Sequence, residues 1–445
     1  MEFLTLYSTE SIAARLSERD GETKLGQCVC FAKGRDYASL RDTNAKYALI
    51  GIPEDIGPRA NCGRGGAESG WNAFISSFLN LQSNSYLSGQ QVVLLGHIDC
   101  NDLQARSRVD CCDNDSAMGA VASGKKDASI ETLRGLVDEL DDRVSSIISS
   151  VLVAGLTPLV IGGGHNNCFP LMRALSSSIK SYSGSGISVP KVGAINLDPH
   201  ADFRRCGPSR DGIGSNEGRH SGNGFRAAYN AGILSAYHIV GLHEQKNNAE
   251  ALAALHAAGS DFSFDTYQDL FLRGHDSRHC GTSAGAGATV DAGLGTDYSD
   301  GSRFNCNCAN YFRQQICRAL ERMTREPQGP NSPLGFGVEL DMDALTMMPA
   351  SAFNAAGVSA AQAAEYVHIA AGWNLQNTST SSVANIPASP WCGDPPTRPT
   401  ARYLHLCEAA PRADSPTDVA VVGQVLSLLV CTFIQAQQAS VRGQG

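Results

Sequence analysis

Residues 192–202 read VGAINLDPHAD, in which an apolar run from Val192 to Leu197 leads directly into Asp198, His200 and Asp202. The apolar part has the composition of a buried strand, so the acidic part lies where the chain leaves a sheet. Alternate residues of an extended segment point the same way, and we expect the three polar side chains to converge. Two carboxylates and one imidazole suit a divalent cation such as Mn²⁺. Taken alone, the pattern also fits a surface turn.

Two other apolar runs end in side chains of the same kind. Residues 334–340 precede Asp341 and Asp343, and a buried pair of like charges is unfavourable unless cations neutralise it. A helix cap would explain one of these aspartates but not both. Residues 159–161 precede three glycines and His165, and glycines let the backbone approach a ligand closely. A phosphate-binding loop is the alternative there, although the Lys-Ser/Thr ending of such loops is absent.

The three strand ends together supply two histidines and four aspartates. His165 by itself would more often be a hydrogen-bonded core residue, but the five other groups give it weight as a ligand. Six such groups suit two metal ions with bridging carboxylates, and a binuclear pair lowers the pKa of a bridging water.

Short apolar runs alternate with helical patterns along most of the chain. Runs that are apolar throughout and separated by helices indicate a parallel sheet covered on both faces, in which ligands gather beyond the carboxyl ends of the strands. Helical spacing predicts a helix over residues 133–151, a capping box at Ser359 and Gln362 opens a helix to about Trp373, and Val419 to Ile434 reads as a buried C-terminal helix. The expected strands are residues 46–52, 92–95, 159–161, 192–197, 238–242, 334–340 and 403–407.

Composition narrows the class of protein. The chain has 445 residues, of which 42% are hydrophobic, so it can bury a large core. A net charge of -9 offers no electrostatic footprint for nucleic acid or an anionic membrane. Its odd number of cysteines, 15, and the absence of a signal pattern at Met1 favour reduced thiols and a cytoplasmic protein. Residues 107–129, 274–307 and 377–400 are polar stretches that we expect to be surface insertions in a single domain spanning residues 1–445.

Beyond these patterns, the three metal-site stretches resemble the metal-binding motifs of the ureohydrolases, the family of arginase, agmatinase and formimidoylglutamase. Residues 51–57 (GIPEDIG) and 217–226 (EGRHSGNGFR) are most similar to the formimidoylglutamase-like branch. Pro199 stands where the family usually has alanine, and the Asp-Pro that often follows the last motif is missing after Asp343. The resemblance implies an arginase-like three-layer α/β/α sandwich with a central, mostly parallel sheet.

The resemblance also assigns roles to single residues. One Mn²⁺ would be held by His165, Asp198, Asp202 and Asp341, and a second by Asp198, His200, Asp341 and Asp343. The implied catalytic residues are Asp202, which accepts a proton, His220, which protonates the leaving amine, and Glu408, which grips the cationic end of the substrate. An anionic substrate needs basic or polar partners, for which the candidates are Arg59, Arg64, Arg204, Asn223 and Arg226.

The implied reaction is hydrolysis of a C–N bond in an amidine or guanidine. The first expectation is N-formimidoyl-L-glutamate, giving glutamate and formamide in histidine catabolism. An agmatinase- or arginase-type enzyme of arginine metabolism, which releases urea, is the second. A catalytically silent metal-binding regulatory relative is the third. The likeness further implies a homotrimer, or a hexamer built from trimers.

Overall fold

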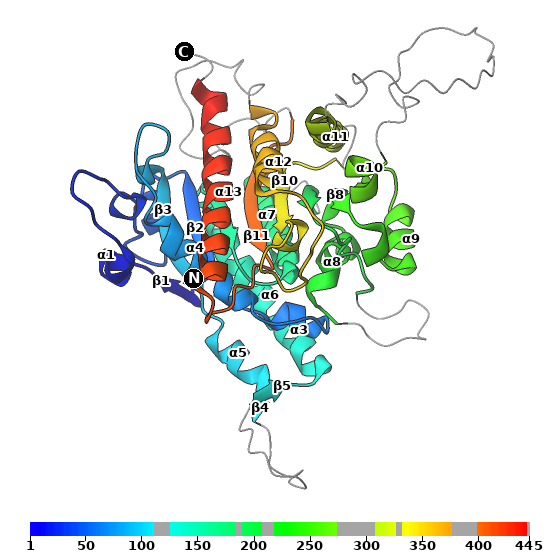
Figure 1. Cartoon of the computed structure of the whole chain (residues 1–445), viewed down its shortest axis with the longest axis horizontal. Helices are drawn as coiled ribbons and strands as arrows, with labels where there is room; N and C mark the ends of the chain where they lie inside the picture. Colours follow the sequence, from blue (N-terminus) through cyan, green and yellow to red (C-terminus); the bar gives the residue numbers. More distant parts are fainter. Residues whose placement is uncertain are drawn as a thin grey trace, which may run out of the picture.

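A nine-stranded sheet runs through the middle of the molecule (Figure 1). The computed structural model describes residues 1–110, 125–183, 189–206, 218–273, 308–325, 332–375 and 398–442. The strand order is β1-β3-β2-β6-β11-β10-β7-β8-β9, and every neighbouring pair is parallel except β1–β3. The strands are β1 (Leu4–Leu6), β2 (Tyr47–Gly51), β3 (Val92–Ile98), β6 (Thr157–Ile161), β7 (Val192–Leu197), β8 (Leu234–Leu242), β9 (Phe262–Thr266), β10 (Phe336–Asp341) and β11 (Ala401–Cys407).

Helices cover both faces of this sheet, because successive strand residues point to opposite sides. Leu49, Leu159 and Ile161 belong to one apolar cluster, whereas Ile50 and Val160 belong to the other. The first cluster lies under α4 (Gly70–Phe78), α11 (Cys308–Met323), α12 (Ala360–Gly372) and α13 (Pro416–Arg442). The second lies under α3 (Ile56–Ala60), α5 (Asn101–Arg106), α6 (Ile130–Val153), α7 (Cys168–Ser183), α8 (Gly224–Asn230) and α9 (Ala249–Ala257). The predicted three-layer α/β/α sandwich is therefore confirmed.

The predicted helices follow their sequence signals closely. The helix expected over residues 133–151 is α6, and Ser359 and Gln362 form the capping box that opens α12. The predicted C-terminal helix is α13, which packs on α4 and α12. Among the described residues α13 is the one helix whose length and composition would allow it to cross a membrane, and half of that stretch is buried. The remaining short helices are α1 (Thr9–Ile12), α2 (Tyr37–Arg41) and α10 (Tyr267–Phe271).

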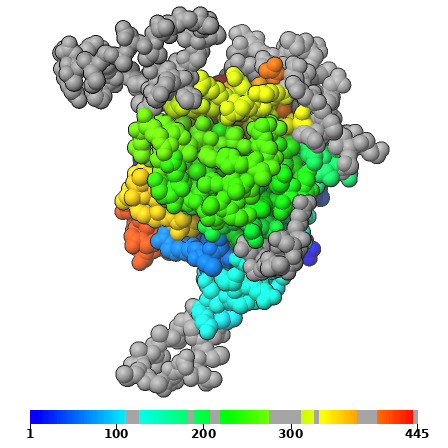
Figure 2. Space-filling model, turned by 90° about the vertical axis from the view of Figure 1, so that its right-hand side faces the viewer, coloured from blue at the N-terminus to red at the C-terminus, as the bar shows by residue number. Residues whose placement is uncertain are grey.

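Of the expected insertions, only the ends of the first are described at length. β4 (Arg108–Asp110) and β5 (Lys125–Asp127) pair as an antiparallel hairpin that, with α5, projects from the body of the molecule (Figure 2). Residues 111–124, 274–307 and 376–397 lie outside the described residues. The sequence did not predict the edge strands β1, which has three residues, and β9, whose three middle residues are half-buried.

Candidate metal centre

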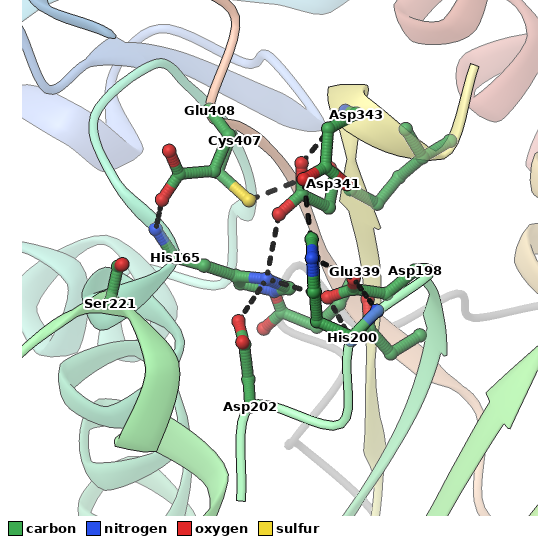
Figure 3. A network of polar contacts seen from close by, with 12 residues as sticks. His165, Asp198, His200, Asp202, Ser221, Glu339, Asp341, Asp343, Cys407 and Glu408 are labelled. Atoms are coloured by element: carbon green, nitrogen blue, oxygen red, sulfur yellow. Dashed lines mark hydrogen bonds and ion pairs between the residues drawn. The ribbon is translucent and has the colours of Figure 1, made fainter. Parts of the chain in front are cut away.

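Four neighbouring strands in the middle of the sheet, β6, β11, β10 and β7, end at one edge. His165 follows β6, Glu408 follows β11, Asp341 ends β10 and Asp198 follows β7. Their side chains point toward one another beyond that edge (Figure 3). Parallel strands present their carboxyl ends together, which is why residues far apart in the chain meet here.

The first group of donor atoms surrounds Nδ1 of His165. That atom lies 2.9 Å from Oδ2 of Asp202, 3.1 Å from Oδ2 of Asp198 and 3.5 Å from Oδ2 of Asp341. Yet Nδ1 forms no hydrogen bond in the described structure. The four side chains therefore converge on one point without forming hydrogen bonds to Nδ1 of His165, as expected for ligands of a common cation.

The second group shares two of these carboxylates. Asp198, His200, Asp341 and Asp343 place one ligand-type atom each within 4.8 Å of the others, as do the four residues of the first group. Nδ1 of His200 lies 3.2 Å from Oδ2 of Asp343. Oδ1 of Asp343 is buried without a hydrogen-bond partner among the described residues. Two overlapping sets with Asp198 and Asp341 in common are the arrangement that two bridged cations require.

The electrostatics of the centre favour added positive charge. Burial and the charge of Asp341 raise the pKa of Asp343 well above its usual range. Burial and the charge of Asp198 raise the pKa of Asp202 to about 6. For Glu339, burial acts in the same direction, but His405 and His165 outweigh it and lower its pKa to about 2. Carboxylates and imidazoles of this number suit Mn²⁺, so the residues present fit a pair of such ions.

Local backbone geometry brings the three residues after β7 together. Oδ1 of Asp198 accepts a hydrogen bond from the backbone N–H of His200 at 2.6 Å, and the amide of Asn196 donates to Oδ2 of Asp198 at 3.0 Å. Asp202 has a φ of 44°, in the left-handed region that few residues other than glycine adopt. The three side chains thus converge through a turned segment, which corrects the expectation of an extended one.

The two aspartates at the end of β10, Asp341 and Asp343, have different local roles. Oδ1 of Asp341 accepts from the backbone N–H of Asp343 at 2.8 Å and so caps the short turn that follows the strand. Asp343 has no such capping role. The cap that sequence reasoning weighed as an alternative accounts for Asp341 and leaves the burial of Asp343 unexplained.

Glu408 lies beside His165 but belongs to neither four-residue donor set. Its Oε1 accepts a hydrogen bond from the backbone N–H of His165 at 2.7 Å, and its other oxygen accepts from the hydroxyl of Ser351. Its φ of 63° turns the chain sharply after β11. Burial and the charge of Asp341 raise its pKa well above the usual range.

A cavity of about 170 Å³ opens onto these groups. Asp202, His200, Asp341, Asp343 and Glu408 line it together with Ser221 and Ser351, and two cationic side chains, Arg204 and Lys246, also border it. Neither Arg204 nor Lys246 forms an ion pair with another described residue. Arg64 lies close by and donates to the carbonyl of Ala350 at 2.5 Å.

The structure does not bring His220 to the cavity. It is 2% exposed, and its Nδ1 accepts from the backbone N–H of Gly222 at 3.1 Å. Burial and the charges of Arg134, Arg219 and Arg204 lower its pKa to about 3. The ring caps the turn that carries Ser221, an arrangement that favours a structural role over the expected proton relay.

Three of the candidate substrate residues also prove structural. All N–H groups of Arg59 are used by Asp55, Asp127, Gln104 and Ser107. The amide of Asn223 is saturated by Arg219, the backbone N–H of His220, and the carbonyls of Arg205 and Gly218. Arg226 pairs with Glu250 at 2.7 Å. None of the three lines the cavity, so the structure does not bring them to the candidate site.

Sequence reasoning missed Ser351, Lys246 and the buried Glu339. Ser351 lies in a turn and Lys246 ends a three-residue 3-10 helix, and such short segments carry no periodic signal that marks a side chain facing a cavity. Glu339 could have been found, because it precedes Asp341 by two residues on the same strand and therefore shares its face.

Comparison with known proteins places the chain in a family. The model of the arginase family matches residues 45–268, half of the chain. A formimidoylglutamase of Hahella chejuensis is 25% identical over 276 residues, covering 60% of this chain and 67% of that protein. One of Clostridium tetani is 29% identical over 143 residues, covering 31% of this chain. That match and several others span only 39% of the relative's length.

Solved structures show the same fold. A Trypanosoma cruzi formiminoglutamase crystallised with Mn²⁺ superposes with a TM-score of 0.53 at 18% identity, covering 93% of this chain and 98% of that one. A Bacillus subtilis formimidoylglutamase gives a TM-score of 0.57 at 13% identity, with coverages of 95% and 94%. The family match, with its motifs at the ends of four central strands, confirms the resemblance seen in the sequence: this chain belongs to the arginase family.

Proposed function

We propose that this chain is a binuclear manganese hydrolase that cleaves a C–N bond of a linear amidine, with N-formimidoyl-L-glutamate as substrate and glutamate and formamide as products. The observation that carries the proposal is the pair of four-donor sets that share Asp198 and Asp341 beside a cavity. The names of the relatives, and the Mn²⁺ in the Trypanosoma cruzi structure, support it.

The six donor residues would hold the two ions as the sets are drawn: His165, Asp198, Asp202 and Asp341 for one, and Asp198, His200, Asp341 and Asp343 for the other. When bound, such a pair lowers the pKa of water and polarises the carbon to be attacked. Asp202 borders the cavity, so its carboxylate lies within reach of a water or substrate bound there. We assign it the role of accepting a proton and passing it toward the leaving nitrogen.

Glu408 is placed to orient the substrate. Its two oxygens are fixed by the backbone of His165 and by Ser351, and it faces the cavity. A carboxylate pairs with a planar amidinium through parallel N–H···O bonds, which sets both position and orientation. Such a pair would hold the amidine carbon of the substrate beside the metal site, and positioning of this kind lowers the barrier to reaction.

Arg204 and Lys246 favour formimidoylglutamate over agmatine. Both border the cavity that Glu408 faces, and neither is paired with another described residue. Cationic groups attract the two carboxylates of a glutamate derivative and repel the free amine of agmatine. The urea-releasing reading stays the second candidate, since Glu408 would orient a guanidinium equally well.

The test is a product assay on the purified chain loaded with Mn²⁺, with formamide, urea and bound metal measured for formimidoylglutamate, arginine, agmatine and guanidinobutyrate. We expect two ions per chain and formamide release. In Lys246→Met, KM for formimidoylglutamate should rise about 10-fold, because the half-buried lysine beside the cavity would contribute roughly one ion pair to substrate binding, with little change in bound manganese. Two bound ions without turnover of any of these compounds would instead favour a regulatory relative.

We also propose a single domain, because one sheet takes its strands from both ends of the chain, from Leu4 to Cys407. A cytoplasmic location is supported by the cysteines: the nine whose side chains are described are all unpaired, as expected in a reducing compartment.

A further inference from the structure

A second polar group lies on the Nε2 side of His165, buried between β10 and β11. Glu339 and His405 are opposite one another in the parallel register of these strands, and Tyr403 precedes His405 by two residues on the same face. All three side chains are fully buried. None of them borders the cavity, so a direct contact with substrate does not explain them.

The three side chains converge on one carboxylate. The hydroxyl of Tyr403 donates to Oε1 of Glu339 at 2.7 Å, and Nδ1 of His405 lies 2.6 Å from Oε2. The same Oε2 lies 3.6 Å from Nε2 of His165 (Figure 3 shows Glu339 beneath the ring). A buried carboxylate is costly unless several donors face it, and here two donors hold it toward the imidazole.

The strand is built to admit this arrangement. A Cβ added at Gly337 would lie 2.2 Å from both the Oη and the Cζ of Tyr403, so any other residue there would displace the ring. Gly337, two residues before Glu339, thus leaves the space through which Tyr403 reaches the carboxylate. The contact therefore depends on a matched pair of positions on adjacent strands.

We propose that Glu339, held by Tyr403 and His405, is a positioning residue that orients His165 for metal binding. The inference rests on the proposed metal site. Nδ1 of His165 faces Asp198, Asp202 and Asp341, so a cation there requires the ring proton on Nε2. That N–H needs an acceptor, and Glu339 is the carboxylate on its side. A carboxylate behind a ligating imidazole selects the tautomer, fixes the ring and makes the ligand more basic.

The same pocket offers a competing use of these residues. His165, His405 and Cys407 form a third group of donors within 4.8 Å of one another. However, the thiol of Cys407 donates to the carbonyl of Leu340 at 3.6 Å, and Nδ1 of His405 lies 2.6 Å from Oε2 of Glu339. Two of the three donors are thus engaged with other groups, so Glu339 and not a third ion is the partner on the Nε2 side.

The test is a Mn²⁺ titration of the full chain by calorimetry and electron paramagnetic resonance, comparing wild type with Glu339→Gln and Glu339→Asp. Glu339→Gln keeps the shape and removes the charge, so affinity for one of the two ions should fall about 10- to 100-fold, the usual effect of losing an outer-shell partner. Glu339→Asp should recover part of that loss. The resonance spectrum of the coupled pair should weaken in proportion.

Tyr366→Phe is the matched control, because that hydroxyl donates to the backbone carbonyls of Ile195 and Glu339 and so stabilises the same strands without touching the carboxylate. We expect it to lower the melting temperature and leave both affinities within about 2-fold, the range of an indirect effect. Should Glu339→Gln fail to fold, Tyr403→Phe removes one donor and keeps the charge, with an expected loss of about 3- to 10-fold.

The possible outcomes separate the two proposals. Wild-type affinity for both ions in Glu339→Gln, or a loss no larger than in Tyr366→Phe, would overturn the positioning role while the metal site stands. A wild-type chain that binds no divalent cation would instead overturn the proposed function itself.

Discussion

Asp343→Asn should have opposite effects on stability with and without manganese. Asp343 is 1% exposed, its Oδ1 has no partner among the described residues, and the capping role belongs to Asp341. Its one favourable contact is with Nδ1 of His200, at 3.2 Å. No structural reason therefore demands a charge at this position when the cations are absent.

The magnitude follows from the distances. With an effective dielectric constant of about 20, each carboxylate within 4.8 Å of Asp343 repels it by at least about 3.5 kcal/mol, so Asp198 and Asp341 together contribute about 7 kcal/mol. Attraction to a protonated His200 at 3.2 Å offsets about 5 kcal/mol of this. Where Asp343 is ionised in the metal-free protein, removing its charge should raise the free energy of unfolding by up to about 2 kcal/mol; because its pKa is raised, the gain should be largest at alkaline pH.

With manganese present the sign reverses. A site filled at 100 times its dissociation constant stabilises the folded state by about 2.7 kcal/mol, and Asp343→Asn forfeits that gain for the second ion. The assay is urea unfolding of wild type and variant in chelator and in excess Mn²⁺. The variant should be at least as stable as wild type in chelator and less stable in manganese.

Asp141→Asn is the control, since Asp141 is equally buried but pairs with Nε of Arg219 at 2.9 Å, and the pair borders neither the cavity nor the donor sets. Breaking a buried pair costs about 3–5 kcal/mol, and here it should do so in both conditions. If Asp343→Asn behaved like Asp141→Asn, losing stability in chelator, then Asp343 would be an ordinary structural acid and the metal-site reasoning would fail.

Three further predictions concern neighbouring groups. Ser351→Ala leaves one oxygen of Glu408 without its donor, so kcat/KM in steady-state assays should fall about 10-fold or more, as for a lost hydrogen bond to a charged group, while manganese titration stays unchanged. In the folded state the pKa of His220 is about 3 instead of 6.5, because the folded state disfavours the protonated ring. The free energy of unfolding should therefore fall by up to about 5 kcal/mol as the pH falls from 6.5 to 3. His220→Asn should flatten this pH dependence of the urea midpoint and keep turnover within a few-fold, whereas a loss of about 100-fold or more would restore a proton-transfer role. Removing metal with chelator should abolish formamide release and lower the melting temperature, and both should return with Mn²⁺.

Much of the fold could be predicted because a strand buried on both faces is apolar along its whole length. The stretch Val192–Leu197 is apolar throughout, and it is a strand with those bounds in the middle of the sheet, buried on both faces. The capping box at Ser359 likewise located the start of α12 to the residue. Edge strands such as β9, with three half-exposed residues, carry no comparable signal.

The six donor residues were predictable for a related reason: each ends an apolar strand or follows one within five residues, so the parallel sheet brings them to one edge. The partners of the candidate arginines could not be predicted from the sequence. Arg59 is held by Asp127, 68 residues away in the chain, and Arg226 by Glu250 on a different helix. Whether a cation faces substrate or an internal acid depends on such partners, which motif spacing does not reveal. Lys246, by contrast, forms no ion pair with a described acid, and its side chain lines the cavity.

In each strand that leads to the metal site, the apolar residues affect folding, whereas the polar residues at its end affect metal binding. In β7 and β10 the apolar residues Ile195, Leu197, Val338 and Leu340 pack into the core under the helices, so truncating them should lower stability whether or not metal is bound. The polar residues beyond them project from a sheet edge that this packing already holds in place. Their mutual repulsion opposes folding, and binding of cations removes that repulsion. Substitution of Asp343 should therefore act mainly through the metal-bound state, whereas substitution of Asp198 should also cost the hydrogen bonds that it accepts from His200 and Asn196.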